Sequence, residues 1–292
     1  MSGRAMPSIN AELCVNCGAC VRTCRFGVFT EGDECPRVDG QATCLACGQC
    51  IAVCPVDAIT HPELPAEGFV ELSPEIPVTP GALMDLLARR RSVKNFEDRQ
   101  VPAEVIARLM DAAALAPSGH NSQSWSFTVI TDRQRLAEVS AALVASYSFL
   151  LKMVGNPLGR LMLRLVAGSA ALRLLVKMQP AIRRIVDGHA WGEDWILGNA
   201  PALVLAHAPK SDAVGDASCR YAMGNMITMA VAEGLGTCLL GLVTAPAQRD
   251  RKIARLLGVP DDHELHEAAV LGYPAITFAR TVPKHEPSVT TI

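Results

Sequence analysis

The sequence lacks three features that would each assign it to a class. Its charges nearly balance, with 27 Lys and Arg against 29 Asp and Glu, so nothing indicates a nucleic-acid partner. Residues 1–10 contain no apolar run of the kind that directs export, so we expect a cytoplasmic protein. No GxGxxG pattern follows a predicted strand, which argues against a Rossmann nicotinamide domain. With half of its 292 residues apolar, the chain is long enough for one sizeable core and a small accessory domain.

Cysteine, in contrast, is abundant and unevenly distributed. The chain has 11 cysteines, and nine of them lie within the first 54 residues. A disulfide framework is one interpretation of such density. Because an intracellular chain keeps its thiols reduced, we favour metal ligands.

Eight of these cysteines form two runs with the spacing C-x2-C-x2-C-x3-C, and the second run ends in Cys54-Pro55. Three thiolates on one tight turn suit three irons of a cubane cluster, with a fourth thiolate arriving from elsewhere. Zinc is the alternative, but zinc sites usually take two cysteines from one turn and a second pair from farther along the chain. The spacing therefore favours iron–sulfur clusters. Cys35 lies outside both runs, and we expect it to be a free thiol.

The two runs resemble those of bacterial ferredoxins with two [4Fe–4S] clusters, and the resemblance covers roughly residues 8–62. In that family the fourth cysteine of each run binds the other cluster. The resemblance thus implies one cluster on Cys14, Cys17, Cys20 and Cys54, and a second cluster on Cys44, Cys47, Cys50 and Cys24.

Five prolines between His61 and Pro80 separate this module from a region of different composition. We therefore place a ferredoxin domain at 1–62, a stiff linker at 63–80 and a second domain at 81–292. In the second domain, apolar periodicity predicts helices at 85–91, 103–115 and 223–233, and strands at 126–131, 202–207, 237–243 and 267–273. Helices with few strands indicate an α+β domain with a central sheet.

Two polar segments of the second domain are candidates for binding a cofactor. Arg90-Arg91-Ser92-Val93-Lys94 offers three cations and a hydroxyl, which can grip a phosphate, although a basic helix end is more often a solvated surface. Residues 116–125 form a Pro/Ser/Gly turn with Asn and Gln amides. Such amides suit the carbonyl and N–H edge of an isoalloxazine ring, and an ordinary polar turn is the alternative.

Together, and about 25 residues apart, these segments resemble the flavin signatures of the nitroreductase family, over residues 81–292. Gly234–Gly241 is similar to the family's segment beside the flavin N5, and Leu271–Pro274 to its ending. The resemblance implies an α+β fold with a central mixed or antiparallel sheet flanked by helices, in an interlocked homodimer. It implies FMN contacts from Arg90, Arg91, Ser92, Lys94, Pro117, Ser118, Gly119, Asn121, Leu240, Gly241 and Lys284.

In most members the loop equivalent to 117–121 comes from the partner subunit, and the residues matching Leu240 and Gly241 place backbone N–H groups near N5. His120 is the candidate general acid, although a hydrogen-bonded turn residue is the commoner role for such a histidine. We expect Cys219 and Cys238 to pack in the core. Two tryptophans, Trp191 and Trp195, either flank the substrate opening or pack in the core or an interface.

A basic helical insert spans about residues 145–187. No acidic residue lies between Glu138 and Asp187, where the cations are Lys152, Arg160, Arg164, Arg173, Lys177, Arg183 and Arg184. These charges argue against a transmembrane helix, and two prolines predict a division into short helices. We favour a lid over the flavin, ahead of a docking face for an acidic electron donor, with a membrane-surface helix as the remaining alternative.

These observations predict an FMN-dependent oxidoreductase. Electrons would enter singly at the clusters, collect on FMN and reduce a nitroaromatic, a quinone or an activated alkene. The expected donor is a ferredoxin or NAD(P)H. A non-catalytic electron carrier or redox sensor, which passes electrons to a protein partner, is the alternative.

Overall fold

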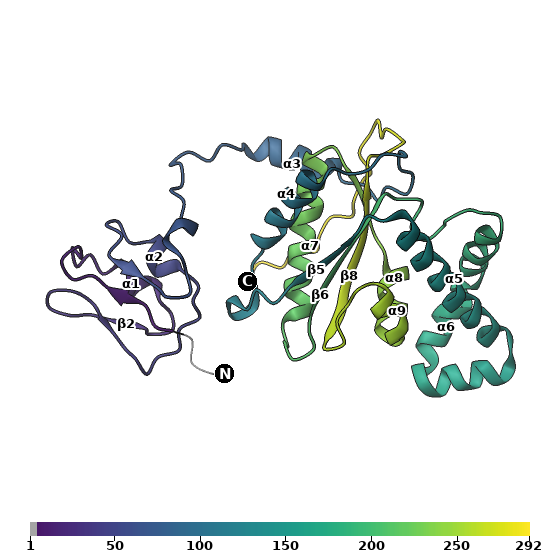
Figure 1. Cartoon of the computed structure of the whole chain (residues 1–292), viewed down its shortest axis with the longest axis horizontal. Coiled ribbons are helices and arrows are strands. Elements are labelled where there is room, and N and C mark those ends of the chain that lie inside the picture. Colours follow the sequence, from purple (N-terminus) through teal and green to yellow (C-terminus); the bar gives the residue numbers. More distant parts are fainter. Residues whose placement is uncertain (1–4) are drawn as a thin grey trace. The chain divides into compact units, whose positions relative to one another are not determined.

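The computed structural model describes residues 5–292, which divide into two compact units (Figure 1). Unit 1 contains the residues up to Pro77 together with His120–Ser122, and unit 2 contains Val78–Gly119 and Gln123–Ile292. Each unit buries its own clusters of apolar side chains. Each therefore has a core of its own.

Unit 1 is built from two short helices and two strand pairs. The helices are α1 (Ala19–Thr23) and α2 (Gln49–Ala52), and a single 3-10 turn, η1 (Ala66–Gly68), follows them. Strand β1 (Ser8–Ile9) pairs antiparallel with β4 (Ile59–Thr60), and β2 (Phe29–Thr30) pairs antiparallel with β3 (Arg37–Val38). Each cysteine run thus leads into one helix, so the two copies in the sequence adopt matching local structures.

Unit 2 is organised around one antiparallel sheet with the strand order β5-β6-β8-β7. Its strands are β5 (Ser126–Ile130), β6 (Ala202–Pro209), β7 (Gly236–Leu239) and β8 (His263–Gly272). The expected α+β domain with a central sheet is confirmed. An isolated parallel bridge from Ser92 to Thr237 extends the edge strand β7, so the pairing is mixed at that edge.

Helices cover both faces of this sheet (Figure 1). They are α3 (Pro80–Arg89), α4 (Ala103–Ala114), α5 (Arg133–Gly155), α6 (Pro157–Ala190), α7 (Gly215–Ala232), α8 (Gly241–Arg249) and α9 (Arg251–Leu256). Among the described helices, α5 alone is long and apolar enough to cross a membrane by length and composition. Its Val139 and Leu143 are fully buried in the core of unit 2, so one face of α5 packs as a core helix.

The central strand β6 explains why the sheet needs two covering layers. Its side chains alternate, so Leu203 and Leu205 enter the cluster formed with α5, α8 and α9. Val204 and Ala206 enter the opposite cluster, formed with α4 and α7. A strand buried on both faces reads as one continuous apolar run, which is how this strand is recognised in the sequence.

Three local expectations were wrong in detail. The strand predicted at 237–243 ends at Leu239, because the chain turns at Leu240 and α8 begins at Gly241. Pro80 belongs to α3 rather than to the linker, since it occupies the first helical turn and the Thr79 hydroxyl caps the helix. Pro180 does not end α6, whose backbone departs from helical geometry at Gly168 instead (φ 84°, ψ 165°).

A buried histidine lies where three strands of the sheet meet. His207 on β6 has only 4% of its surface exposed, and its Nε2 lies 3.1 Å from the Thr128 hydroxyl on β5. Its Nδ1 lies 2.8 Å from Nδ1 of His263, at the start of β8. Burial, followed by the neighbouring His263 and His266, lowers the pKa of His207 to about 4.

This lowered pKa predicts acid sensitivity of unit 2. An unfolded histidine titrates near pH 6.5, so the unfolded state binds more protons below that value and stability falls between pH 6.5 and pH 4. For His207 alone the loss is about 2 kcal/mol on going from pH 7 to pH 4.5. All three tryptophans lie in unit 2, so their fluorescence during urea unfolding reports this unit alone. We expect His207→Gln to lose less stability than wild type over this range; equal losses in the two proteins would refute the assignment.

Candidate functional site

Strand pairing in unit 1 brings cysteines of different runs together. Because β1 pairs with β4, the chain entering the first run lies beside the chain leaving the second, and the Asn10 N–H donates to the Ala58 carbonyl. One cavity is consequently lined by four cysteine side chains, which are Cys14, Cys17, Cys20 and Cys54. These are the four that the ferredoxin resemblance assigns to one cluster.

The pairing of β2 with β3 has the same effect on the other side. Cys24 immediately precedes the turn into β2 and Cys44 follows β3, and both pack around the same small core. Among the described residues, no three His, Cys, Asp or Glu side chains are spaced to hold a single metal ion. A cubane cluster has a different requirement, because each of its four thiolates binds a different iron.

Backbone geometry favours close approach to the cysteine sulfurs. Gly18 and Gly48 precede α1 and α2 with φ values of 67° and 72°, a conformation that glycine adopts without strain. The Ala58 N–H donates to Cys54 Sγ at 3.3 Å, and the Ala46 N–H donates to Cys44 Sγ at 3.4 Å. Such donors stabilise negative charge on sulfur, as a cluster site needs.

Two of the cysteine thiols, those of Cys20 and Cys50, are partly withdrawn from water. Burial raises the pKa of the Cys50 thiol to about 11 and raises the pKa of Cys20 in the same direction. Thiols of this kind stay protonated at neutral pH until a metal replaces the proton. The residues of unit 1 therefore fit a bound metal cluster better than they fit reactive free thiols.

A histidine that the sequence reasoning did not select touches one of these sulfurs. His61 has 5% of its surface exposed, and its Nδ1 accepts the Glu63 N–H at 3.1 Å. The ring proton therefore sits on Nε2, which lies 3.6 Å from Cys44 Sγ and 3.0 Å from the Ala5 carbonyl. The sequence places His61 directly after a strand, but nothing in it indicates that the ring would lie beside Cys44.

Unit 2 contains a cavity of about 580 Å³, within the size range of small-molecule sites. It brings together three residues of the predicted set: Lys94, Leu240 and Gly241. Trp195 also lines it, with the Arg184 guanidinium 4.4 Å from the centre of the indole ring and the indole N–H donating to Glu193. Trp191 does not line it and is largely exposed.

The N-terminus of α8 opens into this cavity. Gly241 is the first residue of the helix, and the N–H groups of a first turn have no acceptor within their own helix. Leu240 differs from the expectation, because its N–H already donates to the Ala268 carbonyl at 2.8 Å and is held in the sheet. Of the two expected donors, Gly241 is therefore the one whose N–H lies at the open N-terminal end of α8.

The basic segment reaches the sheet through a close backbone approach. The Val93 N–H donates to the Thr237 carbonyl at 2.9 Å, and a Cβ on Gly236 would lie only 2.7 Å from Val93 Cβ. Glycine at 236 therefore lets residues 92–94 lie against β7. This contact places exposed Ser92 and Lys94 beside the strand end that leads to the cavity.

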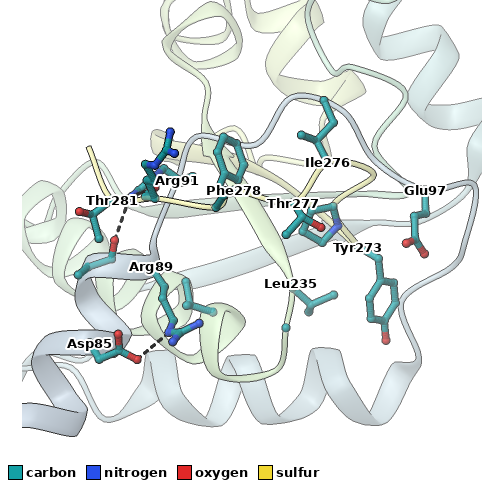
Figure 2. A pocket seen from close by; sticks show the side chains of 16 residues that line it. Asp85, Arg89, Arg91, Glu97, Leu235, Tyr273, Ile276, Thr277, Phe278 and Thr281 are labelled. Carbon is teal, nitrogen blue, oxygen red and sulfur yellow. Dashed lines mark hydrogen bonds and ion pairs between the residues drawn. The ribbon is translucent and has the colours of Figure 1, made fainter. Parts of the chain in front are cut away.

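Arg91 lies in a different cavity of about 650 Å³, lined in part by the C-terminal segment (Figure 2). Its Nη1 donates to the carbonyls of Ala88 and Arg90, and its Nη2 donates to the carbonyl of Arg280. Its Nε is buried and has no hydrogen-bond partner among the described residues. Three of the five N–H groups of Arg91 thus anchor the chain to main-chain carbonyls, and the Nε N–H is enclosed without an acceptor.

The remaining predicted residues lie apart from the 580 Å³ cavity. Gly119 is tightly packed, since a Cβ there would lie 2.8 Å from the Val214 side chain, and Ser118 Oγ accepts the Gln123 N–H. The amide of Asn121, grouped with unit 1, donates to the Ala46 carbonyl at 3.0 Å. Three residues of this loop have left-handed backbones: His120, Asn121 and Gln123. Such strained non-glycine residues are concentrated at functional loops.

Three further predictions concern single side chains. His120 is exposed, and Lys284 lies in an exposed C-terminal segment without regular structure. Cys219 and Cys238 are buried, as expected, and burial raises the pKa of Cys219 to about 12. Neither buried thiol is therefore a ready nucleophile.

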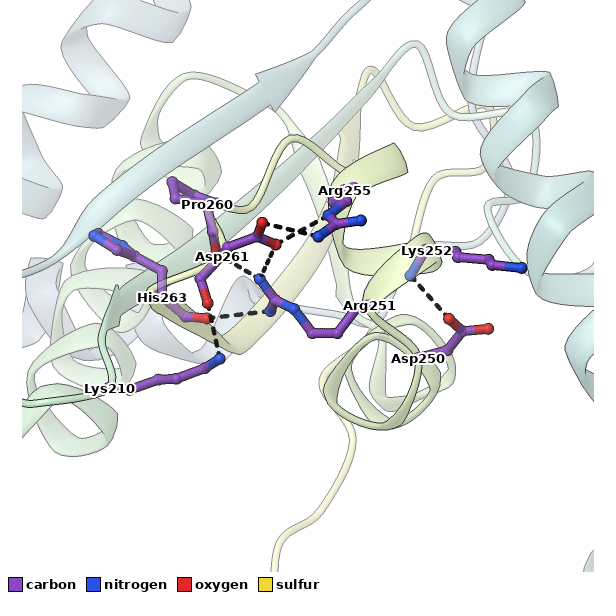
Figure 3. A network of polar contacts seen from close by, with 8 residues as sticks. All are labelled: Lys210, Asp250, Arg251, Lys252, Arg255, Pro260, Asp261 and His263. Carbon is purple, nitrogen blue, oxygen red and sulfur yellow. Dashed lines mark hydrogen bonds and ion pairs between the residues drawn. The ribbon is translucent and has the colours of Figure 1, made fainter.

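Another charged cluster lies just before β8, and its members bind one another (Figure 3). Asp261 accepts hydrogen bonds from Arg251 at 2.6 Å and from Arg255 at 2.9 Å, and these cations hold its pKa well below the usual range. Lys210 donates to the Asp261 carbonyl. These groups bind one another and fix α9 to the start of β8, so they form a structural network.

Comparison with known proteins agrees with both units. Residues 87–273 match the nitroreductase family model, and residues 13–59 match the 4Fe-4S dicluster domain. The first match covers more than half of the chain. The protein belongs to the nitroreductase family. Within this family, the chain carries an additional N-terminal dicluster domain.

The relatives of this nitroreductase-family protein are distant. It is 26% identical over 191 residues to a protein of Archaeoglobus fulgidus named as an NADH dehydrogenase/NAD(P)H nitroreductase, covering 65% of this chain and 84% of that one. It is 25% identical to iodotyrosine deiodinase 1 of Pongo abelii, covering 74% and 67%. A nitroreductase of Bacteroides fragilis, solved with bound FMN, shares the fold with a TM-score of 0.53 and 21% identity, covering 72% and 98%.

The His61 contact predicts a change in one cluster and not in the other. The single Nε2 proton of His61 lies nearer the Ala5 carbonyl than Cys44 Sγ, so the sulfur receives only a share of it. Even a shared N–H stabilises the extra negative charge of the reduced cluster, so His61→Leu should lower the potential of the cluster held by Cys44. A full hydrogen bond of about 1 kcal/mol corresponds to about 40 mV for one electron, which sets the upper limit of this shift. The measurement is an EPR-monitored redox titration of the full-length protein, with His61→Gln as the variant that retains a donor. Unchanged potentials in His61→Leu, or equal shifts of both clusters, would contradict this assignment.

Proposed function

We propose that the protein is an FMN-dependent oxidoreductase that receives electrons through two [4Fe–4S] clusters and reduces a small acceptor such as a nitroaromatic, a quinone or an activated alkene. The observation that carries this proposal is the presence of two different sites in one chain. Unit 1 has a cavity lined by four cysteines, and unit 2 has a cavity of about 580 Å³ at the start of α8. An electron relay needs the first kind of site and a substrate-reducing enzyme needs the second.

The residues of unit 2 fit FMN. Lys94, which lines the 580 Å³ cavity, would hold its phosphate together with the nearby exposed Ser92. Arg91 lies in the other cavity, and its bonds to main-chain carbonyls would hold this segment in place. The Gly241 N–H at the start of α8 would face the ring, where the partial positive charge of a helix N-terminus favours added electrons. When bound, FMN supplies a store for two electrons that are released to the acceptor as a pair. The FMN in the similar Bacteroides fragilis structure supports this proposal.

The residues of unit 1 fit two clusters. Cys14, Cys17, Cys20 and Cys54 would hold one cluster, and Cys44, Cys47, Cys50 and Cys24 would hold the other. Each cluster passes single electrons at low potential. Joining the two units in one chain raises the effective concentration of the cluster module at the flavin, so that two successive single-electron transfers can occur without a second binding event.

We further propose a cytoplasmic homodimer in which the partner subunit's copy of residues 117–119 completes the flavin site. The similarity to NAD(P)H nitroreductases supports either NAD(P)H or a ferredoxin as donor. The similarity to iodotyrosine deiodinases adds halogenated aromatics to the acceptors worth testing. At the cavity, Trp195 offers a flat apolar surface for an aromatic acceptor, held in place by Arg184 and Glu193.

The decisive experiment is anaerobic reoxidation of the dithionite-reduced full-length protein. We expect p-nitrobenzoate, a quinone or an activated alkene to oxidise the flavin at least tenfold faster than oxidised ferredoxin does, because the unit 2 cavity admits small molecules. 3-Iodo-L-tyrosine is tested in parallel. Rapid oxidation by ferredoxin, with all small acceptors leaving the flavin reduced, would instead establish an electron carrier.

Ligand assignment is tested by iron content. Cys54→Ala removes one side chain from the cavity shared with Cys14, so we expect the content to fall from about eight irons per chain towards four. Cys35→Ala is the matched control, since Cys35 lies outside both runs and should leave eight irons. Iron and sulfide are quantified after anaerobic reconstitution. A full complement in Cys54→Ala, or fewer than eight irons in wild type, would overturn the assignment.

A further inference from the structure

The first half of α6 carries an apolar face that is largely exposed to solvent. Its side chains recur at helical spacing and each exposes at least half of its surface. We call this set the α6 apolar face: Leu158, Leu161, Met162, Leu165 and Val166. Isolated exposed leucines are ordinary on a protein surface, but five aliphatic side chains on one stripe of a helix indicate a binding surface.

The contact between α6 and α5 lies on a different side of α6 from the α6 apolar face. Gly159 is buried, and a Cβ there would lie 2.3 Å from the Met153 carbonyl oxygen of α5. Leu163, one turn further along, is also partly buried. Gly159 and Leu163 thus seat α6 on the body of unit 2, whereas the α6 apolar face lies on another side of the helix.

The charges around this face have one sign. No Asp or Glu occurs between Glu138 and Asp187, and among the described residues none of the seven cations there forms an ion pair. Arg160 and Arg164 are both exposed and lie one turn apart. Arg164 is the nearer of the two to the α6 apolar face, whereas Arg160 lies on the opposite side of the helix, where its Nε donates to the Val154 carbonyl at 2.6 Å. After Gly168 the same combination continues, with Arg173 and Lys177 beside exposed Leu174 and Met178.

We infer that this surface docks the protein on an anionic lipid bilayer, with the α6 apolar face inserted among the acyl chains near the headgroups. Aliphatic side chains on one side of a helix and long cations on the neighbouring side are the pattern of interfacial helices. The Arg164 side chain, and those of Arg173 and Lys177 after Gly168, can extend to the phosphate level. Each basic residue near such a surface adds to the attraction.

Other occupants fit the observations less well. A second copy of α6 would bring one unpaired basic surface against another, which is repulsive. An acidic protein donor would satisfy the cations but would leave the aliphatic stripe without a hydrocarbon partner. As a lid, α6 would line the cavity beneath it, yet the 580 Å³ cavity takes no lining residue from 157–190. The lid interpretation favoured by the sequence therefore fits the cavity less well than a lipid surface fits the α6 apolar face.

The test is cosedimentation of the full-length holoprotein with vesicles of phosphatidylcholine alone or with 30 mol % phosphatidylglycerol, about the anionic content at which surface charge attracts basic segments. We expect at least tenfold tighter binding to the anionic vesicles, weakened by 0.5 M NaCl. Comparable binding to both vesicle types, or no binding to either, overturns the inference.

Variants separate the apolar and cationic contributions. Leu165→Gln with Val166→Gln should weaken binding about tenfold, while the control pair Leu83→Gln and Met84→Gln, exposed on α3, should not. Arg164→Gln with Arg173→Gln should weaken binding to a similar extent, and the charge-conserving Lys pair should retain it. Circular dichroism confirms that each variant is folded.

Light scattering tests whether a second copy of the chain, and not a lipid surface, covers the α6 apolar face. If the Leu165 and Val166 pair changes the oligomeric state and leaves vesicle binding intact, the α6 apolar face belongs to a second copy and the inference fails. Reoxidation by soluble acceptors is measured on the same variants without vesicles. Because that assay needs no membrane, loss of lipid binding and failure of the proposed reductase activity remain distinguishable.

Discussion

Burial of β6 on both faces is the constraint on which the rest of unit 2 depends. A strand without a solvent-exposed face requires a helical layer on each side, and Leu203 and Val204 mark the two cores that result. The helical layers in turn force the connecting segments to the sheet ends. The start of α8 and the segment at Ser92 both meet the edge strand β7 there. The packing of the sheet therefore brings Lys94, Leu240 and Gly241 to one cavity, although they come from distant parts of the sequence.

Unit 1, in contrast, has only a small apolar core. Its core contains few large side chains, of which Val28, Phe29 and Ile59 are buried, and cysteines fill much of the remainder. A module of this size gains little from burial alone and commonly relies on bound metal for its stability. The cysteines thus fill part of the core as well as lining the proposed cluster sites. Bound clusters would therefore add to the stability of this domain.

Sequence reasoning succeeded where the determining interactions are local. Cysteine spacing on a tight turn, apolar alternation along β6 and the periodicity of 103–115 are each readable within a short window. It failed where a distant partner decides. Nothing near Leu240 announces that its N–H is taken by Ala268, and nothing near Arg91 shows that two of its nitrogens bind main-chain carbonyls. The ferredoxin resemblance supplied one such distant partner. It groups Cys54 with the first run, and the pairing of β1 with β4 places Cys54 in the same cavity as that run.

The uneven distribution of charge now acquires a structural meaning. Elsewhere in the described chain, several arginines form ion pairs with nearby carboxylates, as Arg108 does with Glu233 and Arg255 does with Asp261. Such exposed pairs contribute little to stability, but they prevent a field of one sign from forming. The stretch from Glu138 to Asp187 has no such pairing, and it is also where apolar side chains remain uncovered. A fold gains nothing from leaving both kinds of group unsatisfied at one place, so the coincidence is better explained by a surface that supplies anionic groups and hydrocarbon together.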